Sequence, residues 1–416
     1  MTPATRQVVF INAAHTFTHY CLLILATAVL AMVTQERERF GADYGPILAL
    51  GTGMFVTYGL GALPMGWLAD RLGRRALMVA FFLGTGFFMA AAGFMDSPFG
   101  IGIALGLMGC FAAIYHPIGT AVLVEAAGER VGRAMGINGV FGNIGVATAP
   151  VVTAFIAASL GWRWAFIIPG VACFLTGLLY AREPDFDAVK AGGGARPFPE
   201  IPRALVRRAV FILLSIAAVS GLVFNAYTLL IPKLMEERLA GSPDLLPVVG
   251  LLAFLATICG GATQYTVGRM IDSRTLKRVF MPLGIAVVPG MLALSFLDGW
   301  LVLPVAGLVA ACVFGQVTVN ETMTARYVAP ALRAKLYSIR FTVGFLGAAI
   351  ASPLIAFLHE ATGSLAVAMV VLAGVAMVTL VCAFAFPDRE EELKPELWAR
   401  APEFARERAG LAQPAE

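Results

Sequence analysis

The sequence predicts an all-α membrane protein with twelve transmembrane helices, from its hydropathy, its low charge content and the spacing of its apolar stretches. Of the 416 residues, 59% are hydrophobic and 13% are charged, whereas an ordinary soluble domain carries about 25% charged residues. The mean hydropathy is +0.82. So few polar residues cannot cover a water-facing surface, which excludes a soluble fold. A spanning helix needs about 20 apolar residues, and the chain has room for twelve with short loops.

The apolar stretches form two sets of six, separated by a polar segment. The first set is expected near residues 8–33, 46–68, 76–95, 99–124, 134–158 and 163–181, and the second near 209–232, 246–268, 279–297, 300–323, 336–358 and 364–386. The segment between them, 182–208, contains three consecutive glycines, four prolines and six basic residues, a composition typical of a linker. We therefore expect an N-terminal bundle (1–181), a cytoplasmic linker (182–208), a C-terminal bundle (209–387) and a solvated or weakly helical cytoplasmic tail (388–416).

The first apolar stretch and the basic residues indicate how the chain lies in the membrane. Residues 8–33 are too long for a cleaved signal peptide and contain Asn12, His15 and His19, which favours a retained first span. With both termini inside, the inside loops and tails hold 24 Lys and Arg, and the outside loops hold five. This bias predicts that both termini are cytoplasmic. A bacterial inner membrane is the expected location.

The two sets of spans repeat one another at an offset of 202 residues. Gly66-x-x-x-Asp70 recurs as Gly268-x-x-x-Asp272, Gly142-x-x-Gly145 as Gly344-x-x-Gly347, and Gly161 as Gly363. The three matches stand at corresponding places in the order of spans. Duplication of a six-helix unit accounts for them, so we expect two pseudo-symmetric bundles (6 + 6) with a binding site at their interface.

The loop after the second span carries a motif with a mechanical role. It reads Gly66-Trp67-Leu68-Ala69-Asp70-Arg71-Leu72-Gly73-Arg74-Arg75. This segment resembles the G-x-x-x-D-R-x-G-R-R signature of the major facilitator superfamily at every fixed position, and the resemblance extends over about residues 8–386. A carboxylate at a helix end can accept backbone N–H groups or pair with arginine. Asp70 is therefore predicted to latch two helices in one conformation. The conformational candidates in the two copies of this loop are Gly66, Asp70, Arg71, Gly73, Arg74 and Asp272, and the alternative role for the arginines is to set topology.

The fifth span carries a second pattern of small residues. Gly136 is followed at nine residues by Gly145 and then by Ala149-Pro150, which is similar to the antiporter motif of the same superfamily with some glycines replaced. Small residues let neighbouring helices approach, and a proline permits a bend. Gly136, Gly145 and Pro150 are therefore conformational candidates, with generic helix packing as the alternative.

A narrower resemblance begins at Tyr115-His116-Pro117 and continues into Gly132–Gly136 and the glycines of the fifth span. Together with His15, this combination resembles the fosmidomycin-resistance type of efflux carrier within the superfamily. Proton-coupled drug antiporters of the superfamily usually have an arginine in the fourth span. This chain has none between Phe99 and Val124, and His116 occupies that span instead.

Polar residues in the first and fourth spans are the main candidates for substrate binding or proton coupling. Asn12, His15 and His19 lie on one helical face by their spacing, and a histidine within a membrane span faces a cavity or a partner. Imidazole can carry protons near neutral pH or donate hydrogen bonds to a substrate. The alternative for His15, His19 and His116 is a structural hydrogen bond between helices.

The C-terminal set of spans supplies its own candidates. Gln316 and Asn320 share a helical face, and Glu321 and Arg340 are the plausible pair of opposite charges, so we expect these two to pair or lie close. Arg340 could bind an anionic substrate with Glu321 as a proton-linked competitor. Alternatively the pair forms an inside gate, which their position near the cytoplasmic span ends favours. Tyr115 is a further candidate. The weaker candidates, each more typical of helix packing or of hydrogen bonds between helices than of ligand contact, are Asn138, Asn225, Tyr58, Tyr227 and Gln264.

Enzyme chemistry and resident cofactors are not indicated. No nucleotide-binding glycine loop, H-E-x-x-H motif or catalytic serine setting is present. The six cysteines fall in six different spans without metal-ligand spacing, and His15 and His19 have no neighbouring thiolates or carboxylates in the sequence, so no metal site is expected.

We therefore expect a secondary active transporter working by alternating access, with proton-coupled export of a small polar or amphiphilic compound as the preferred direction. One alternative is a proton-coupled importer of an organic anion or nutrient, and another is a non-transporting membrane sensor or scaffold. The expected partners are a small-molecule substrate, protons and the lipid bilayer. We expect no nucleic acid partner and a monomer.

Overall fold

The computed structural model describes residues 2–41, 43–127, 131–184, 199–240 and 245–402, and every element assigned in these ranges is helical. The N-terminal half contains α1 (Pro3–Gln35), α2 (Arg37–Phe40), α3 (Tyr44–Ala49), α4 (Thr52–Gly61), α5 (Met65–Leu72), α6 (Arg74–Phe94), α7 (Pro98–Ala112), η1 (Tyr115–Gly119), α8 (Thr120–Ala127), α9 (Val131–Leu160) and α10 (Trp162–Tyr180). The C-terminal half contains α11 (Arg203–Met235), η3 (Glu236–Ala240), α12 (Leu246–Ser273), α13 (Leu276–Phe296), η5 (Gly299–Leu301), α14 (Val302–Tyr327), α15 (Pro330–Thr362) and α16 (Ala366–Ala385), followed by η6 (Glu390–Glu392) and η7 (Pro395–Arg400).

The predicted set of twelve spans is confirmed when one bent pair of helices is counted as a single span. Within the described residues, eleven helices are long and apolar enough to cross a membrane, and the segments Tyr44–Gly61 and Met65–Leu72 join at an angle of 63° to make the second span. Pro64 stands at this break, where its missing N–H cannot continue the helix. The seventh span begins at Arg203, within the segment expected to be linker.

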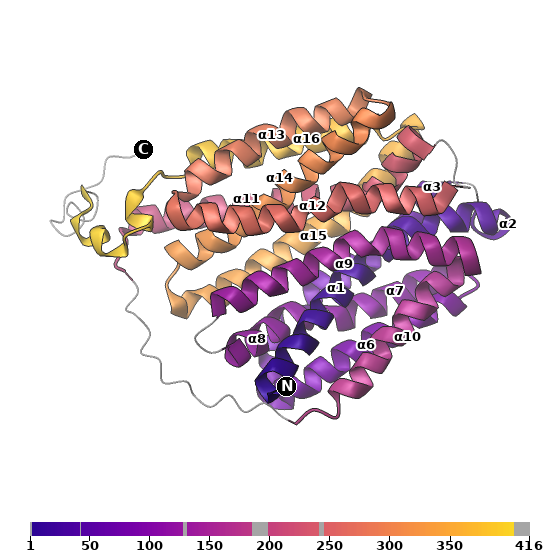
Figure 1. Cartoon of the computed structure of the whole chain (residues 1–416), viewed down its shortest axis with the longest axis horizontal. Coiled ribbons are helices and arrows are strands. Elements are labelled where there is room, and N and C mark those ends of the chain that lie inside the picture. The colour runs from indigo at the N-terminus through magenta and orange to yellow at the C-terminus, as the bar shows by residue number, and fades with distance from the viewer. Residues whose placement is uncertain (1, 42, 128–130, 185–198, 241–244, 403–416) are drawn as a thin grey trace.

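The two halves lie side by side, with the first half in indigo to magenta and the second in orange to yellow (Figure 1). They meet where α9 packs along α12 and where α3 and α4 pack against α15. The offset of 202 residues appears in three dimensions. Gly161 and Gly363 both adopt a positive φ, of 95° and 67°, in the turns that follow α9 and α15. Both copies of this position thus use a glycine with a positive φ to turn the chain after a long helix.

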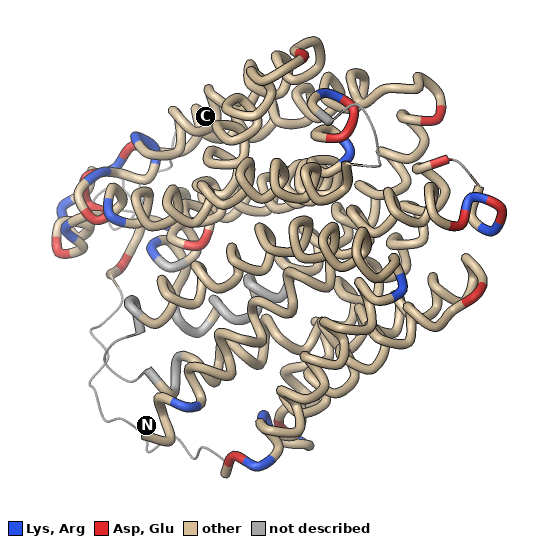
Figure 2. The backbone as a smooth tube through the Cα atoms, turned by 45° about the vertical axis from the view of Figure 1, so that its right-hand side comes forward, with Lys and Arg blue, Asp and Glu red and all other residues tan. Residues whose placement is uncertain are grey.

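The outer surface fits a lipid environment. Large apolar side chains point outward from many spans; for example, Phe99, Phe211 and Phe296 are 78%, 73% and 70% exposed. Charged residues gather at the two ends of the helices and leave the middle of the molecule almost free of charge (Figure 2). Exposed apolar area on this scale is incompatible with water and marks a membrane-embedded belt.

The halves touch closely at the end of the molecule where α1 leads into α3. Ser352 donates a hydrogen bond of 2.5 Å to the carbonyl of Leu48, and a Cβ added to Gly45 would lie 3.0 Å from the carbonyl oxygen of Ala356. At the opposite end, a Cβ added to Gly66, Gly136 or Gly268 would meet no heavy atom within 4 Å. Among the described residues, close contact between the halves is therefore seen around Gly45 and Ser352, and these three glycines at the opposite end have open space beside them.

The tail after the last span folds back as a small cap on the second half. Trp398 is only 2% exposed and packs against Tyr327. The carboxylate of Glu392 accepts hydrogen bonds from the Tyr327 hydroxyl (2.5 Å) and from the backbone N–H of Leu276 (3.0 Å). Short helical turns at Glu390–Glu392 and Pro395–Arg400 agree with the weakly helical form of the expected tail, and one buried tryptophan and one buried carboxylate anchor this segment to the second half.

Candidate functional site

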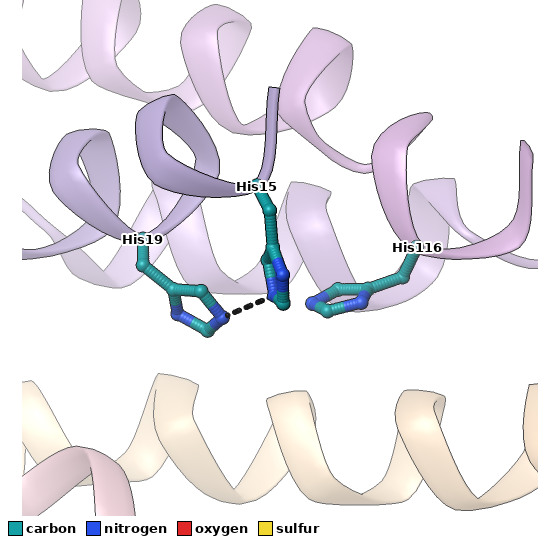
Figure 3. A group of neighbouring side chains, drawn as sticks. All are labelled: His15, His19 and His116. Carbon is teal, nitrogen blue, oxygen red and sulfur yellow. Dashed lines mark hydrogen bonds between the residues drawn. The ribbon is translucent and has the colours of Figure 1, made fainter. Parts of the chain in front are cut away.

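Three histidines from two segments of the N-terminal half come together where the halves face one another. His15 and His19 stand one turn apart on α1, and His116 comes from η1 (Figure 3). The η1 segment is a π-helical turn that contains Pro117, and wide turns of this kind are frequent at functional sites. The ring centroids of His15 and His116 are 5.5 Å apart, and those of His19 and His116 are 5.8 Å apart. All three side chains are partly exposed.

Hydrogen bonds fix which nitrogen of His15 carries its proton. His15 Nδ1 lies 2.7 Å from the backbone carbonyl oxygen of Asn138, which can only accept. Nδ1 is therefore the donor, and in the neutral ring Nε2 carries a lone pair. His19 Nε2 lies 3.1 Å from that lone pair and donates to it. The result is an ordered chain of donors that runs from His19 through His15 to the backbone of α9.

Asn138 is the centre of a buried polar network around the histidines. Its Nδ2 donates to Asn12 Oδ1 over 3.0 Å, and its Oδ1 accepts from the Tyr115 hydroxyl over 3.0 Å. One side chain of α9 thus holds polar groups of both α1 and η1. Asn12, His15, Tyr115 and Asn138, which were separate candidates in the sequence, form a single network with mutually satisfied hydrogen bonds.

Two glycines of α9 make room for the histidines. A Cβ added to Gly142 would lie 2.6 Å from the His15 ring, and one added to Gly145 would lie 2.4 Å from the carbonyl oxygen of Thr16 and 3.1 Å from His19 Cβ. Only residues without a side chain permit this approach. The sequence assigned Gly145 a conformational role; in the structure it sets the distance between α1 and α9.

The C-terminal half covers the histidines with aromatic rings. Phe341 stacks on His116 at a centroid distance of 4.9 Å and an interplanar angle of 18°. The guanidinium of Arg340 lies 5.4 Å from the centre of the Phe341 ring, and Arg340 pairs with Glu321 as expected. Because Glu321 and Arg340 belong to α14 and α15 of the same half, their ion pair does not itself join the two halves. Phe341 thus connects this pair to the histidines.

Other sequence candidates lie apart from this cluster. Asn225 bonds to the carbonyl of Gly221 on its own helix. Gln316 and Asn320 are each 6% exposed, and neither shares a hydrogen bond with the histidines in the described part of the chain. Asn320 Oδ1 is buried and lacks a protein partner among the described residues.

Sequence reasoning missed residues that join the halves. Asn143 donates to Gln264 across the α9–α12 interface, and Phe345 packs on Tyr58 at 4.4 Å. Asn143 lies inside the repeated Gly142-x-x-Gly145 pattern, and this position between two contact glycines was the available signal. Nothing in the sequence distinguishes Phe341 or Phe345 from other apolar residues of their span.

The conformational candidates differ in their contacts within the described part of the chain. Asp70 and Asp272 are exposed, and neither makes a hydrogen bond or ion pair with a described residue. Gly73 ends α5 with a φ of 81°, and the guanidinium of Arg71 stacks 3.8 Å above Trp67. Arg74 is exposed. The Pro150 carbonyl lies 2.8 Å from the position of a Cβ added to Gly250 on α12, so Pro150 stands at the end where the halves touch.

Comparison with known protein families gives one match across the chain. The sequence matches the family described as Major Facilitator Superfamily over residues 10–320 and 245–411. The two matched ranges together include both halves of the fold and the whole histidine cluster.

Curated relatives include proteins named for organic acids and for drugs. The chain is 27% identical to a cis,cis-muconate transport protein of Acinetobacter baylyi over 38% of this chain and 39% of the relative. It is 27% identical to a multidrug resistance protein B homolog of Mycobacterium tuberculosis, over 36% of this chain and 29% of that one. A probable L-galactonate transporter of Escherichia coli is 31% identical over 32% of this chain and 30% of its own. The matches span well under two thirds of these relatives.

Solved structures share the whole fold. A bacterial homolog of the human lysosomal transporter Spinster, in an inward-facing and occupied conformation, superposes with a TM-score of 0.68 at 14% identity and full coverage of both chains. The same protein in an inward-facing and unoccupied conformation gives a TM-score of 0.65 at 13% identity. At this identity the likeness concerns the fold.

Proposed function

Because the chain belongs to the major facilitator superfamily, whose members are transporters and not enzymes, we propose that it is a secondary active transporter exporting a small polar or amphiphilic compound in exchange for protons. The observation that carries this proposal is the histidine cluster at the interface of the halves. Polar and ionisable groups within a membrane are costly unless they serve a pathway or a site. In transporters built from two halves, such a site lies near the midplane between them.

Two polar systems face one another in the proposed site. The N-terminal half contributes His15, His19 and His116, and the C-terminal half contributes Arg340 with its partner Glu321. Phe341, the neighbour of Arg340 in the chain, stacks on His116, so the histidines and the ion pair lie on opposite sides of this aromatic contact. Imidazoles in this position can take up and release protons, and Arg340 offers a charge for an anionic group of the substrate. We propose His19 and His116 as the proton-coupling residues.

The closed end of the interface supports a conformational assignment. We propose that both termini are cytoplasmic in a bacterial inner membrane, as the excess of basic residues on that side predicts. The end where Ser352 bonds to Leu48 is then the periplasmic end, and the conformation is inward-facing. Asp70, exposed here, would engage in the opposite conformation, when the cytoplasmic ends of the helices approach.

A second direction of transport has specific support. The relatives named for muconate and L-galactonate bear the names of organic acids, and Arg340 gives the C-terminal half a cationic group at the site. Import of an organic anion with protons is therefore the alternative to export. Export would lower the amount of substrate in the cells, and import would raise it.

The test is accumulation of a labelled compound panel, including aromatic dicarboxylates, sugar acids and phosphonates, in cells that express the wild type or the His19→Ala variant. The expected result is that cells expressing the wild type accumulate less of the compound than cells expressing the variant. A protonophore should remove this difference. Higher accumulation in wild-type cells would establish import. Purified protein in liposomes that binds a compound but moves none of the panel would overturn transport and favour a sensor.

A further inference from the structure

We propose that His15, His19 and His116 form a binding site for one divalent transition-metal ion of the Zn²⁺ type, with three imidazole ligands and a fourth position open to a small anion. The proposal concerns binding alone: while an ion is bound, the three imidazoles coordinate it and do not take up protons, so proton coupling through His19 and His116 belongs to the metal-free protein. In the sequence the His15 and His19 pair stood alone. The fold adds a third imidazole from a span about a hundred residues later.

The spacing of the ring nitrogens is close to that of a metal site. One nitrogen from each histidine lies within 4.8 Å of the others. A tetrahedral Zn²⁺ ion holds imidazole nitrogens at about 2.0–2.1 Å, which places two of them roughly 3.4 Å apart. His15 Nε2 and His19 Nε2 are already 3.1 Å apart. Binding of an ion requires the nitrogens that lie up to 4.8 Å apart to move closer together.

The surroundings prepare the rings for this role. Histidines that bind metals usually donate their second N–H to a carbonyl or carboxylate, which orients the ring. His15 makes this bond with the Asn138 carbonyl and so presents Nε2 toward the other two histidines. His116 is held by its stacking on Phe341, and neither of its nitrogens bonds to a protein group in the described part of the chain. The three rings lie in a row, with His15 between His19 and His116, opposite a helix of the C-terminal half (Figure 3).

The donor set selects a class of ion. Imidazole suits Zn²⁺, Cu²⁺, Ni²⁺ and Co²⁺, whereas Mg²⁺ and Ca²⁺ require oxygen ligands. Three neutral ligands leave the ion with its full charge, so an anionic fourth ligand such as hydroxide or a carboxylate is favoured in this low-dielectric setting. All three histidines belong to the N-terminal half. An ion bound there can remain in place while the halves move.

The first test titrates Co²⁺ and Zn²⁺ into the purified full chain without a polyhistidine tag. We expect one Co²⁺ per chain with the strong visible absorption of a four-coordinate ion, displaced by Zn²⁺ and unaffected by Mg²⁺. His15→Asn, His19→Asn and His116→Asn should each weaken binding at least tenfold. The control is His359→Asn, because His359 is the fourth histidine of the chain and bonds to Glu237 far from the cluster.

A second measurement needs no variant. Chemical modification of histidines in the wild type, read by mass spectrometry, should show that Zn²⁺ protects His15, His19 and His116 and leaves His359 unchanged. The proposal is overturned if Co²⁺ binding survives in all three cluster variants, if His359→Asn weakens binding equally, or if Zn²⁺ protects none of the three. A thiolate charge-transfer band would also overturn it, because it would assign the ion to a cysteine.

Discussion

The side-chain amide of Asn143 donates a hydrogen bond of 2.6 Å to the side-chain oxygen of Gln264, and this bond joins the two halves between α9 and α12. It lies between the closed end of the interface and the end where Gly136 and Gly268 meet no neighbour. A rocking motion of the halves changes the distance between α9 and α12. The bond therefore stabilises the present conformation relative to others.

Loss of this bond should shift the balance of conformations. We expect Asn143→Ala or Gln264→Ala to weaken the contact by about 0.6 kcal/mol, an average value for hydrogen bonds inside membranes, and so to change the ratio of conformations about threefold. Spin labels at Phe99 and Trp300, which are 78% and 72% exposed on different halves, would report longer distances. Asn225→Ala is the control, since Asn225 bonds within its own helix. Unchanged distance distributions in both variants would refute the role of the bond.

Gly142 and Gly344 occupy equivalent positions of the two halves, yet a methyl group should affect them differently. In Gly142→Ala the new Cβ would lie 2.6 Å from the His15 ring, whereas in Gly344→Ala it would lie 3.6 Å from the Ala217 carbonyl, an ordinary contact. We expect the first variant to displace His15 and to lower transport at least tenfold. The second should retain transport within about twofold and the same melting temperature, because an overpacked contact costs about 1–3 kcal/mol and an ordinary contact does not. Equal transport by both variants would contradict this difference.

Variants of Glu321 and Arg340 can distinguish a structural role of this ion pair from a role in substrate binding. Arg340→Gln leaves the Glu321 carboxylate without its cation, so the melting temperature should fall, by about 2–4 °C for each kcal/mol lost. The double variant Glu321→Gln, Arg340→Gln removes both charges and should recover most of that loss. If Arg340 binds an anionic substrate, transport should stay low in the double variant. Recovery of transport together with stability would assign the pair a purely structural role.

Glu392 should make the stability of the cap formed by residues 390–400 depend on pH. Burial raises the pKa of the Glu392 carboxyl above its ordinary value of 4.5, despite the groups that donate to it. The folded state thus favours the protonated acid, so its stabilising contribution is complete below pH 4.5 and is lost as pH rises through the folded pKa. We expect the melting temperature of Glu392→Gln relative to that of the wild type to increase as pH rises above 4.5, because only the wild type loses stability as its carboxyl ionises. Glu390→Gln is the control, since the Glu390 side chain is 77% exposed. Parallel pH curves for wild type and Glu392→Gln would refute the assignment.

Periodicity and composition predicted the backbone of this protein better than its interface. Twelve spans, the 202-residue repeat and the shared face of Asn12, His15 and His19 follow from local spacing, because a membrane forces each span to form its own hydrogen bonds. The Glu321 and Arg340 pair was predictable because isolated charges are rare inside a bilayer. Contacts between halves are different. Phe341 stacks on His116 through the relative placement of two bundles, which spacing along one helix does not determine.

The tail after the last span also shows what composition alone cannot predict. Its charged composition indicated a solvated or weakly helical segment; the segment is weakly helical, and Trp398 fills a site between Tyr327 and neighbouring apolar groups. One buried aromatic ring outweighs several exposed charges because the charges can stay in water while the ring is buried. Composition averaged over a segment cannot register a single anchor of this kind.

The π-helical turn at Tyr115–Gly119 changes how the fourth span must be read by mutagenesis. A turn with i to i+5 bonds contains one residue more than an α-helical turn, and one residue corresponds to about 100° of rotation. A helical wheel drawn without interruption from Pro98 to Ala127 therefore misplaces the residues of α8 relative to those of α7. Cysteine scanning of this span should use two separate wheels. Deleting one residue within the turn should restore a regular helix, whereas a deletion elsewhere in the span would rotate every side chain beyond it.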